Sequence, residues 1–187
     1  MQGIGKMDLV LDVLGLSNLY GFLELKDAIA NFLKNSLTIS NVCNILDASR
    51  LYELDSLSQI CFTFIDKFAS ELLTEESFSF LSMSTLVIIL TRDSFFCPEI
   101  DLFQAVKRWI ELNTDLKPED ARKVVTEVRL PLISLENLLT IVRPTGLMDA
   151  EKLLDAIHVK TQSKVKRLPH RGRVCPEENI ATIKVSF

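Results

Sequence analysis

The chain has 187 residues, a formal net charge of −4, 48% hydrophobic residues and 25% charged residues. This composition argues against nucleic-acid binding, which usually brings a basic excess, and the longest apolar run, residues 86–90, is far shorter than the roughly 20 residues that cross a bilayer. Six glycines and six prolines, among abundant Leu, Ile, Glu and Lys, favour helices over a turn-rich sheet protein.

Apolar residues recur at helical spacing along residues 8–161, and helix start signals separate the runs. Pro98 and Pro118 each precede acidic residues, which suit a first helical turn, and Ser134 is placed to cap the next helix. The sequence predicts ten helices, near residues 8–20, 23–35, 40–50, 56–72, 75–81, 84–91, 98–113, 118–128, 134–142 and 149–161. The run at 84–91 also fits a buried strand. Short links predict an all-α fold of stacked antiparallel helical hairpins.

The first two predicted hairpins resemble each other in sequence. Residues 14–33 align without gaps to residues 46–65, and the identical pairs are Leu14/Leu46, Ser17/Ser49, Leu19/Leu51, Tyr20/Tyr52, Leu25/Leu57 and Phe32/Phe64. A repeat of this length indicates two successive hairpins, each of which buries its apolar face against its neighbour. Chance similarity between two amphipathic segments is the alternative.

The composition changes after residue 161. Six Lys and Arg residues crowd residues 160–173, where they could bind phosphates, act as a localisation signal or belong to a solvated linker. Ile183, Val185 and Phe187 then alternate with polar residues, which predicts a short extended C-terminal tail, the first strand of a further domain.

Motifs that carry chemistry are missing from the sequence. His158 and His170 are the two histidines, and neither has partners at metal-ligand spacing. The four cysteines form no C-x-x-C pair, which predicts free thiols in a reducing, cytoplasmic setting. There is no nucleophile elbow and no glycine-rich phosphate loop, so we expect no enzyme, no cofactor and no metal. Trp109, the one tryptophan, is either a core residue or an exposed anchor for a partner.

Several segments, in order, resemble a known family. Residues 38–73, 76–82, 92–113 and 128–134 are similar to a BACK domain, the all-helical module that follows BTB domains, and residues 11–33 resemble the last two helices of a BTB domain. Residues 142–148, 153–164 and 175–184 resemble one particular member. The resemblance divides the chain into truncated BTB helices (1–36), a BACK domain (37–161), and a basic linker with the start of a discoidin-like domain (162–187).

The resemblance implies a non-catalytic adaptor that links a BTB domain to a substrate-binding module. Such adaptors bind the N-terminal region of cullin-3, bring a substrate to ubiquitylation, and dimerise only if the BTB domain is present; no nucleic acid or membrane is involved. The candidate contact residues are Tyr20, Asn41, Ile45, Ser49 and Tyr52. The alternatives are that the two tyrosines hold the hairpins together, and that the chain is a helical-repeat scaffold unrelated to ubiquitin. The adaptor hypothesis predicts an apolar groove near the first two hairpins, without a polar cluster inside it.

Overall fold

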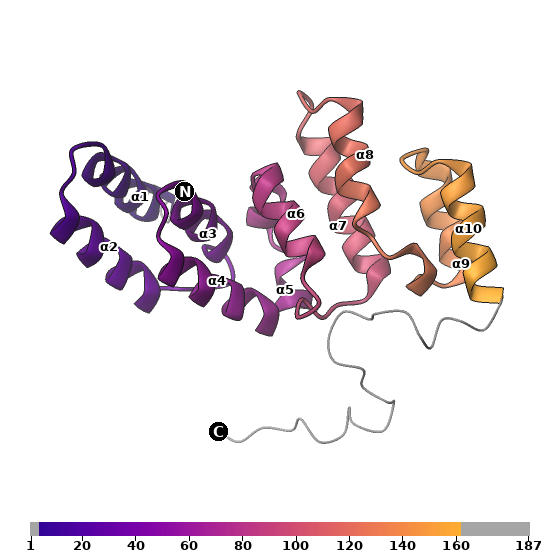
Figure 1. Cartoon of the computed structure of the whole chain (residues 1–187), viewed down its shortest axis with the longest axis horizontal. Coiled ribbons are helices and arrows are strands. Elements are labelled where there is room, and N and C mark those ends of the chain that lie inside the picture. Colours follow the sequence, from indigo (N-terminus) through magenta and orange to yellow (C-terminus); the bar gives the residue numbers. More distant parts are fainter. Residues whose placement is uncertain (1–3, 162–187) are drawn as a thin grey trace, which may run out of the picture.

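A computed structural model describes residues 4–161, and within that range every regular element is helical. The helices stand side by side in one row, with α1–α4 at one end and α9 and α10 at the other (Figure 1). The all-α prediction is confirmed, and residues 84–91 form a helix and not a strand. The predicted extended tail lies outside the described residues. In the described part, no helix combines the length and the apolar character that crossing a membrane requires.

The helices are α1 (Ile4–Leu19), α2 (Leu23–Asn35), α3 (Val42–Leu51), α4 (Asp55–Lys67), α5 (Ala69–Leu72), α6 (Met83–Thr91), α7 (Glu99–Leu112), α8 (Pro118–Thr126), α9 (Leu135–Asn137) and α10 (Ala150–Thr161). Helix α1 packs against α2, and α3 packs against α4. Helix α2 also contacts α4, so the two hairpins lie in sequence against each other.

The repeat predicted from residues 14–33 and 46–65 is present in the backbone. Ser17 Oγ donates to the Leu14 carbonyl (2.7 Å), and Ser49 Oγ donates to the Leu46 carbonyl (2.8 Å). Each hairpin turn also closes on the carbonyl of its serine, from the N–H groups of residues 22 and 54. The equivalent turn positions, Gly21 (φ 72°) and Glu53 (φ 55°), are both left-handed. Equal hydrogen bonds at equal offsets show that the two hairpins share one backbone geometry.

The middle of the chain departs from the predicted helices. The helix expected at 56–72 is interrupted at Phe68 (φ −116°, ψ 32°), which separates α4 from α5. The segment expected as a helix at 75–81 is a 3-10 turn, Glu76–Phe80. Side chains from α7 and from the residue after it hold residues 73–79: Arg108 Nη2 donates to the Leu73 carbonyl (2.5 Å), and Asn113 Nδ2 donates to the Ser79 carbonyl (3.3 Å). Tertiary hydrogen bonds therefore replace the intrahelical ones here.

Trp109 is buried in the hydrophobic core of the row of helices. Its side chain is 1% exposed, and Nε1 donates to the Leu81 carbonyl (2.8 Å). The core interpretation is confirmed, and Trp109 is not a surface anchor. Phe78, Phe95 and Phe103 are equally inaccessible and belong to the same core. A buried indole with a satisfied N–H fixes α7 against the 3-10 turn before it.

The C-terminal elements follow the predicted start signals. Pro118 is the first residue of α8, with acidic residues after it. Ser134 Oγ accepts the N–H of Asn137 (3.1 Å) and caps α9. Helix α9 continues as a π-helical turn, Leu138–Val142, and a 3-10 turn, Arg143–Thr145. Gly146, at φ 65°, ends this run before α10.

Candidate protein-interaction site

A groove opens between α1, α3 and the start of α6, and its volume is about 520 Å³. The residues that line it are Leu11, Asp12, Asp47, Ala48, Arg50, Leu51, Tyr52, Phe80, Ser82, Ser84 and Thr85. Leu51 is 72% exposed and Phe80 is 64% exposed, so both offer apolar surface that the fold leaves uncovered. We call this feature the α1–α3–α6 groove.

The α1–α3–α6 groove also contains a polar network, and the prediction of a groove without polar groups is wrong. The Asp47 carboxylate accepts from the Ser82 N–H (2.8 Å) and from Ser82 Oγ (2.5 Å). Arg50 Nη1 donates to Thr85 Oγ1 (2.8 Å), and the Thr85 N–H donates to Ser82 Oγ (3.3 Å), which caps α6. Because these groups bond to one another across 35 residues, they fix α3 against α6 and set the shape of the groove.

The predicted contact residues lie in different settings. Tyr20 is 67% exposed, beyond the end of α1, and its ring lies 6.2 Å from that of Phe22. Tyr52 is half-buried and lines the α1–α3–α6 groove. A Cβ atom on Gly15 would lie 2.7 Å from Tyr52 Oη, so the absence of a side chain on Gly15 lets the Tyr52 ring pack directly against α1. That contact supports a hairpin-holding role for Tyr52, while its contact with a partner stays a prediction.

The other three candidates take part in the fold. Asn41 Oδ1 accepts the N–H of Thr38 (2.8 Å), and Nδ2 donates to the Ser36 carbonyl (2.8 Å), so this side chain folds the link before α3. Ile45 and Ser49 are fully buried, and Ser49 Oγ also lies 2.8 Å from Ser58 Oγ. The structure therefore does not bring the five residues to one surface. Ile45 and Ser49 have no surface for direct contact.

A second apolar surface was not predicted from the sequence. Leu14 and Ser17 on α1 are buried, whereas Leu9, Leu16 and Leu19 on its opposite side are between 52% and 73% exposed. The turn and α2 add exposed apolar side chains at Phe22, Leu23, Leu25 and Phe32. We call these residues, with Tyr20, the α1–α2 apolar face. No clear signal in the sequence indicates it, because Asp8 and Asp12 lie on the same side of α1 as Leu16 and Leu19.

Two buried thiols have strongly raised pKa values. Burial raises the pKa of the Cys43 thiol and of the Cys61 thiol to about 12, which keeps both sulfurs protonated and poorly nucleophilic. Residues 4–161 contain no group of three or more His, Cys, Asp or Glu side chains that could hold a metal ion. The site consists of exposed apolar side chains beside a polar network whose members bond to one another.

Fold and surface together define the class: an all-helical protein-interaction module built from stacked hairpins. The family model for BACK (BTB And C-terminal Kelch) matches residues 42–143. The chain belongs to the BACK family.

Similar proteins support this assignment over most of the chain. The chain is 47% identical over 174 residues to BTB/POZ domain-containing protein 9 of Drosophila melanogaster, a match that covers 93% of this chain and 23% of the relative. The protein of the same name from Homo sapiens is 43% identical over 179 residues, with 96% of this chain and 29% of the relative covered. BTB/POZ domain-containing protein 6 of Homo sapiens is 35% identical over 138 residues, a match that covers 69% of this chain and 26% of the relative. The chain thus spans between a fifth and a third of the length of these relatives.

Proposed function

We propose that the chain is a non-catalytic adaptor module of a cullin-3 type ubiquitin ligase substrate receptor, acting in the cytoplasm. In this role it links a BTB domain to a C-terminal module that binds the substrate for ubiquitylation. One observation supports the proposal most directly: a chain of the BACK family presents an open groove, rimmed by exposed Leu51 and Phe80, on its first two hairpins. Residues 38–73, which the resemblance assigns to cullin contact, supply α3 to this groove.

The shape of the α1–α3–α6 groove suits the side chains of a helix or an extended peptide. Leu51 and Phe80 would supply the apolar contact that is removed from water on binding. Asp12 and Ser84 lie at the same groove and would supply polar contacts at the rim. The bonded Asp47–Ser82 and Arg50–Thr85 pairs would keep the groove in one shape, so that little ordering entropy is lost on binding.

The α1–α2 apolar face has a separate place in the proposal. It carries eight large apolar side chains that are at least 43% exposed, over one hairpin. We propose that the remainder of a BTB domain covers this face, and that dimerisation depends on that remainder. Cullin-3 binding would then need both the BTB portion and the α1–α3–α6 groove.

The test is a binding titration with the N-terminal region of cullin-3. The 187-residue chain is compared with the same chain fused behind the BTB portion of the Homo sapiens relative. The proposal predicts weak binding by the chain alone and a clear gain for the fusion. The matched control is the BTB portion by itself, which should bind more weakly than the fusion because it lacks the groove. Equal binding by the fusion and by the BTB portion would count against the proposal.

The repeated hairpin favours a second candidate function, a helical-repeat interaction scaffold unrelated to ubiquitin. Two hairpins with equal closing hydrogen bonds are the unit from which such scaffolds are extended. The same titration separates the two functions, because a scaffold of this kind would show no cullin-3 binding as the chain alone and no gain over the BTB portion in the fusion.

A further inference from the structure

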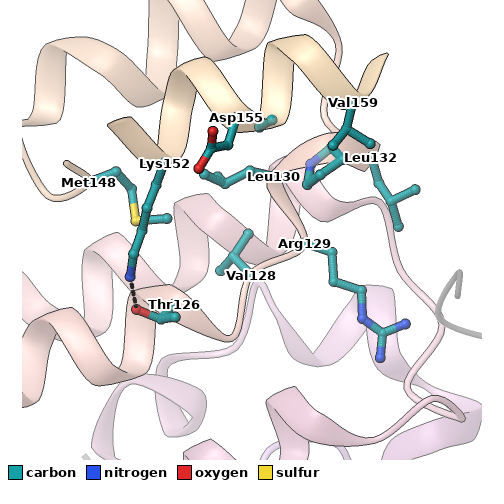
Figure 2. A pocket seen from close by; sticks show the side chains of 11 residues that line it. Thr126, Val128, Arg129, Leu130, Leu132, Met148, Lys152, Asp155 and Val159 are labelled. Carbon is teal, nitrogen blue, oxygen red and sulfur yellow. Dashed lines mark hydrogen bonds between the residues drawn. The ribbon is translucent and has the colours of Figure 1, made fainter. Parts of the chain in front are cut away.

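A second groove lies at the far end of the row of helices, between α10 and the segment that follows α8. Its volume is about 360 Å³. The lining is mainly apolar, and the residues are Thr126, Val128, Arg129, Leu130, Pro131, Leu132, Met148, Lys152, Asp155, Ala156 and Val159 (Figure 2). We call it the α10 groove. It shares no residue with the α1–α3–α6 groove.

Two lysines of α10 each donate a hydrogen bond to the opposite wall of the α10 groove. Lys152 Nζ donates to Thr126 Oγ1 (3.1 Å), as Figure 2 shows. Two helical turns further on, Lys160 Nζ donates to the Pro131 carbonyl (3.1 Å). The groove between them is therefore a formed feature with bonds at both ends.

The wall opposite α10 offers side chains and not a strand edge. The N–H groups of Val128, Leu130, Leu132 and Ile133 donate to carbonyls of the same segment. The Arg129 N–H donates to Glu99 Oε2 (3.1 Å), and residue 131 is a proline without an N–H. Addition of a strand needs free N–H groups, so an occupant of this groove must bind through apolar side chains.

We propose that the α10 groove binds a segment of the same chain, residues 162–169. These residues lie outside the described part of the chain, and their sequence is QSKVKRLP. They follow directly on Thr161, the last residue of α10, and Val159 of the groove lies only two residues earlier. The segment supplies two apolar residues, Val165 and Leu168.

The short tether to α10 favours this segment over other occupants. From Thr161 back to Lys152 the distance along α10 is about 14 Å, at 1.5 Å for each residue of a helix. About four extended residues cover that distance, so an eight-residue segment has enough length for the turn as well. Charge does not select the occupant, because Asp155 lines the groove together with Arg129 and Lys152. A tethered segment also has a high effective concentration, so that a small groove is sufficient for it.

Paramagnetic NMR of the whole 187-residue chain tests the proposal. A nitroxide label is attached at residue 167 in an Arg167→Cys, Cys175→Ser variant. Cys43, Cys61 and Cys97 are buried and do not compete for the label. We expect the methyl signals of the α10 groove, such as those of Val128 and Val159, to lose most of their intensity, while signals of the distant core, such as Leu33, keep theirs.

Two further samples decide between the outcomes. Val165→Ser with Leu168→Ser in the same labelled chain should restore the groove signals, whereas the matched control Val174→Ser should leave the loss unchanged. In a mixture of labelled copies and isotope-enriched unlabelled copies we expect no loss. A loss in the mixture would assign the groove to a second copy, and no loss in the single-chain sample, or a loss that survives the Val165 and Leu168 substitutions, would overturn the proposal.

Discussion

Replacement of Trp109 by phenylalanine tests how α7 is fixed in the core. The indole N–H donates a hydrogen bond to the Leu81 carbonyl (2.8 Å). Both residues are buried, with Trp109 1% exposed and Leu81 2% exposed. A buried carbonyl left without its donor costs about 1–3 kcal/mol. The smaller ring adds a cavity cost, so Trp109→Phe should lower the free energy of unfolding by about 2–4 kcal/mol.

The measurement is urea unfolding followed by far-UV circular dichroism, because the substitution removes the only tryptophan fluorescence. Leu112→Ala is the matched control, since Leu112 is on the same helix and 55% exposed. Surface substitutions of this kind change stability by about 0.5 kcal/mol or less. A Trp109→Phe variant as stable as the Leu112→Ala control would refute the reasoning.

Three other predictions concern the turn, the thiols and one ion pair. Glu53 is the left-handed residue of the second hairpin turn (φ 55°), so Glu53→Gly should raise the free energy of unfolding by about 0.5–1 kcal/mol in urea titrations, and no gain would contradict the assigned turn. Burial raises the pKa of Cys43 and Cys61 from 9.0 to about 12. The folded state therefore keeps protons that the unfolded state releases, so the free energy of unfolding should fall as the pH rises from 9 towards 12. A Cys43→Ala variant should show a weaker fall over the same pH range. A fall equal to that of the unaltered chain would refute this cause. Arg92 pairs with Asp66 through both Nε and Nη2 (3.2 and 2.5 Å), and Arg92→Lys, which keeps the charge but not the two parallel bonds, should cost about 1 kcal/mol in thermal unfolding, whereas an unchanged melting temperature would show that charge alone suffices.

The sequence predicts where several helices begin and which hairpins repeat, because residues close in the sequence determine these features. Pro118 begins α8, and Ser134 caps α9, as the residue types indicate. The repeat between residues 14–33 and 46–65 is also correct, since Ser17 and Ser49 make the same hydrogen bond in both hairpins. These features depend on neighbours within four residues, which sequence patterns report well.

Residues 68–81 could not be predicted in this way. Their carbonyls at Leu73, Ser79 and Leu81 accept hydrogen bonds from side chains of α7 and of the residue that follows it, 28 to 35 residues away in the sequence. Periodicity does not show such partners, so the apolar spacing suggests ordinary helices where the chain forms a short helix and a 3-10 turn.

The candidate site was likewise predicted only in part from the sequence. The five contact residues were named from the family resemblance, which does not distinguish exposed positions from buried ones, and Ile45 and Ser49 lie in the core. Phe80 was missed because it reaches the α1–α3–α6 groove from the 3-10 turn, whose position depends on α7. Asp47 meets Ser82 and Arg50 meets Thr85 across 35 residues, which only the packing of α3 against α6 reveals.

The most direct measurement of the adaptor role is the affinity of groove variants for the N-terminal region of cullin-3, in the BTB-fused chain. Leu51→Asp and Phe80→Asp place a carboxylate in the α1–α3–α6 groove, while Phe96→Asp places one at an equally exposed phenylalanine outside it. We predict that each groove variant loses at least about tenfold in affinity, or about 1.4 kcal/mol, and that Phe96→Asp binds like the unaltered fusion. Full affinity in both groove variants, with unchanged melting temperatures, would contradict the account.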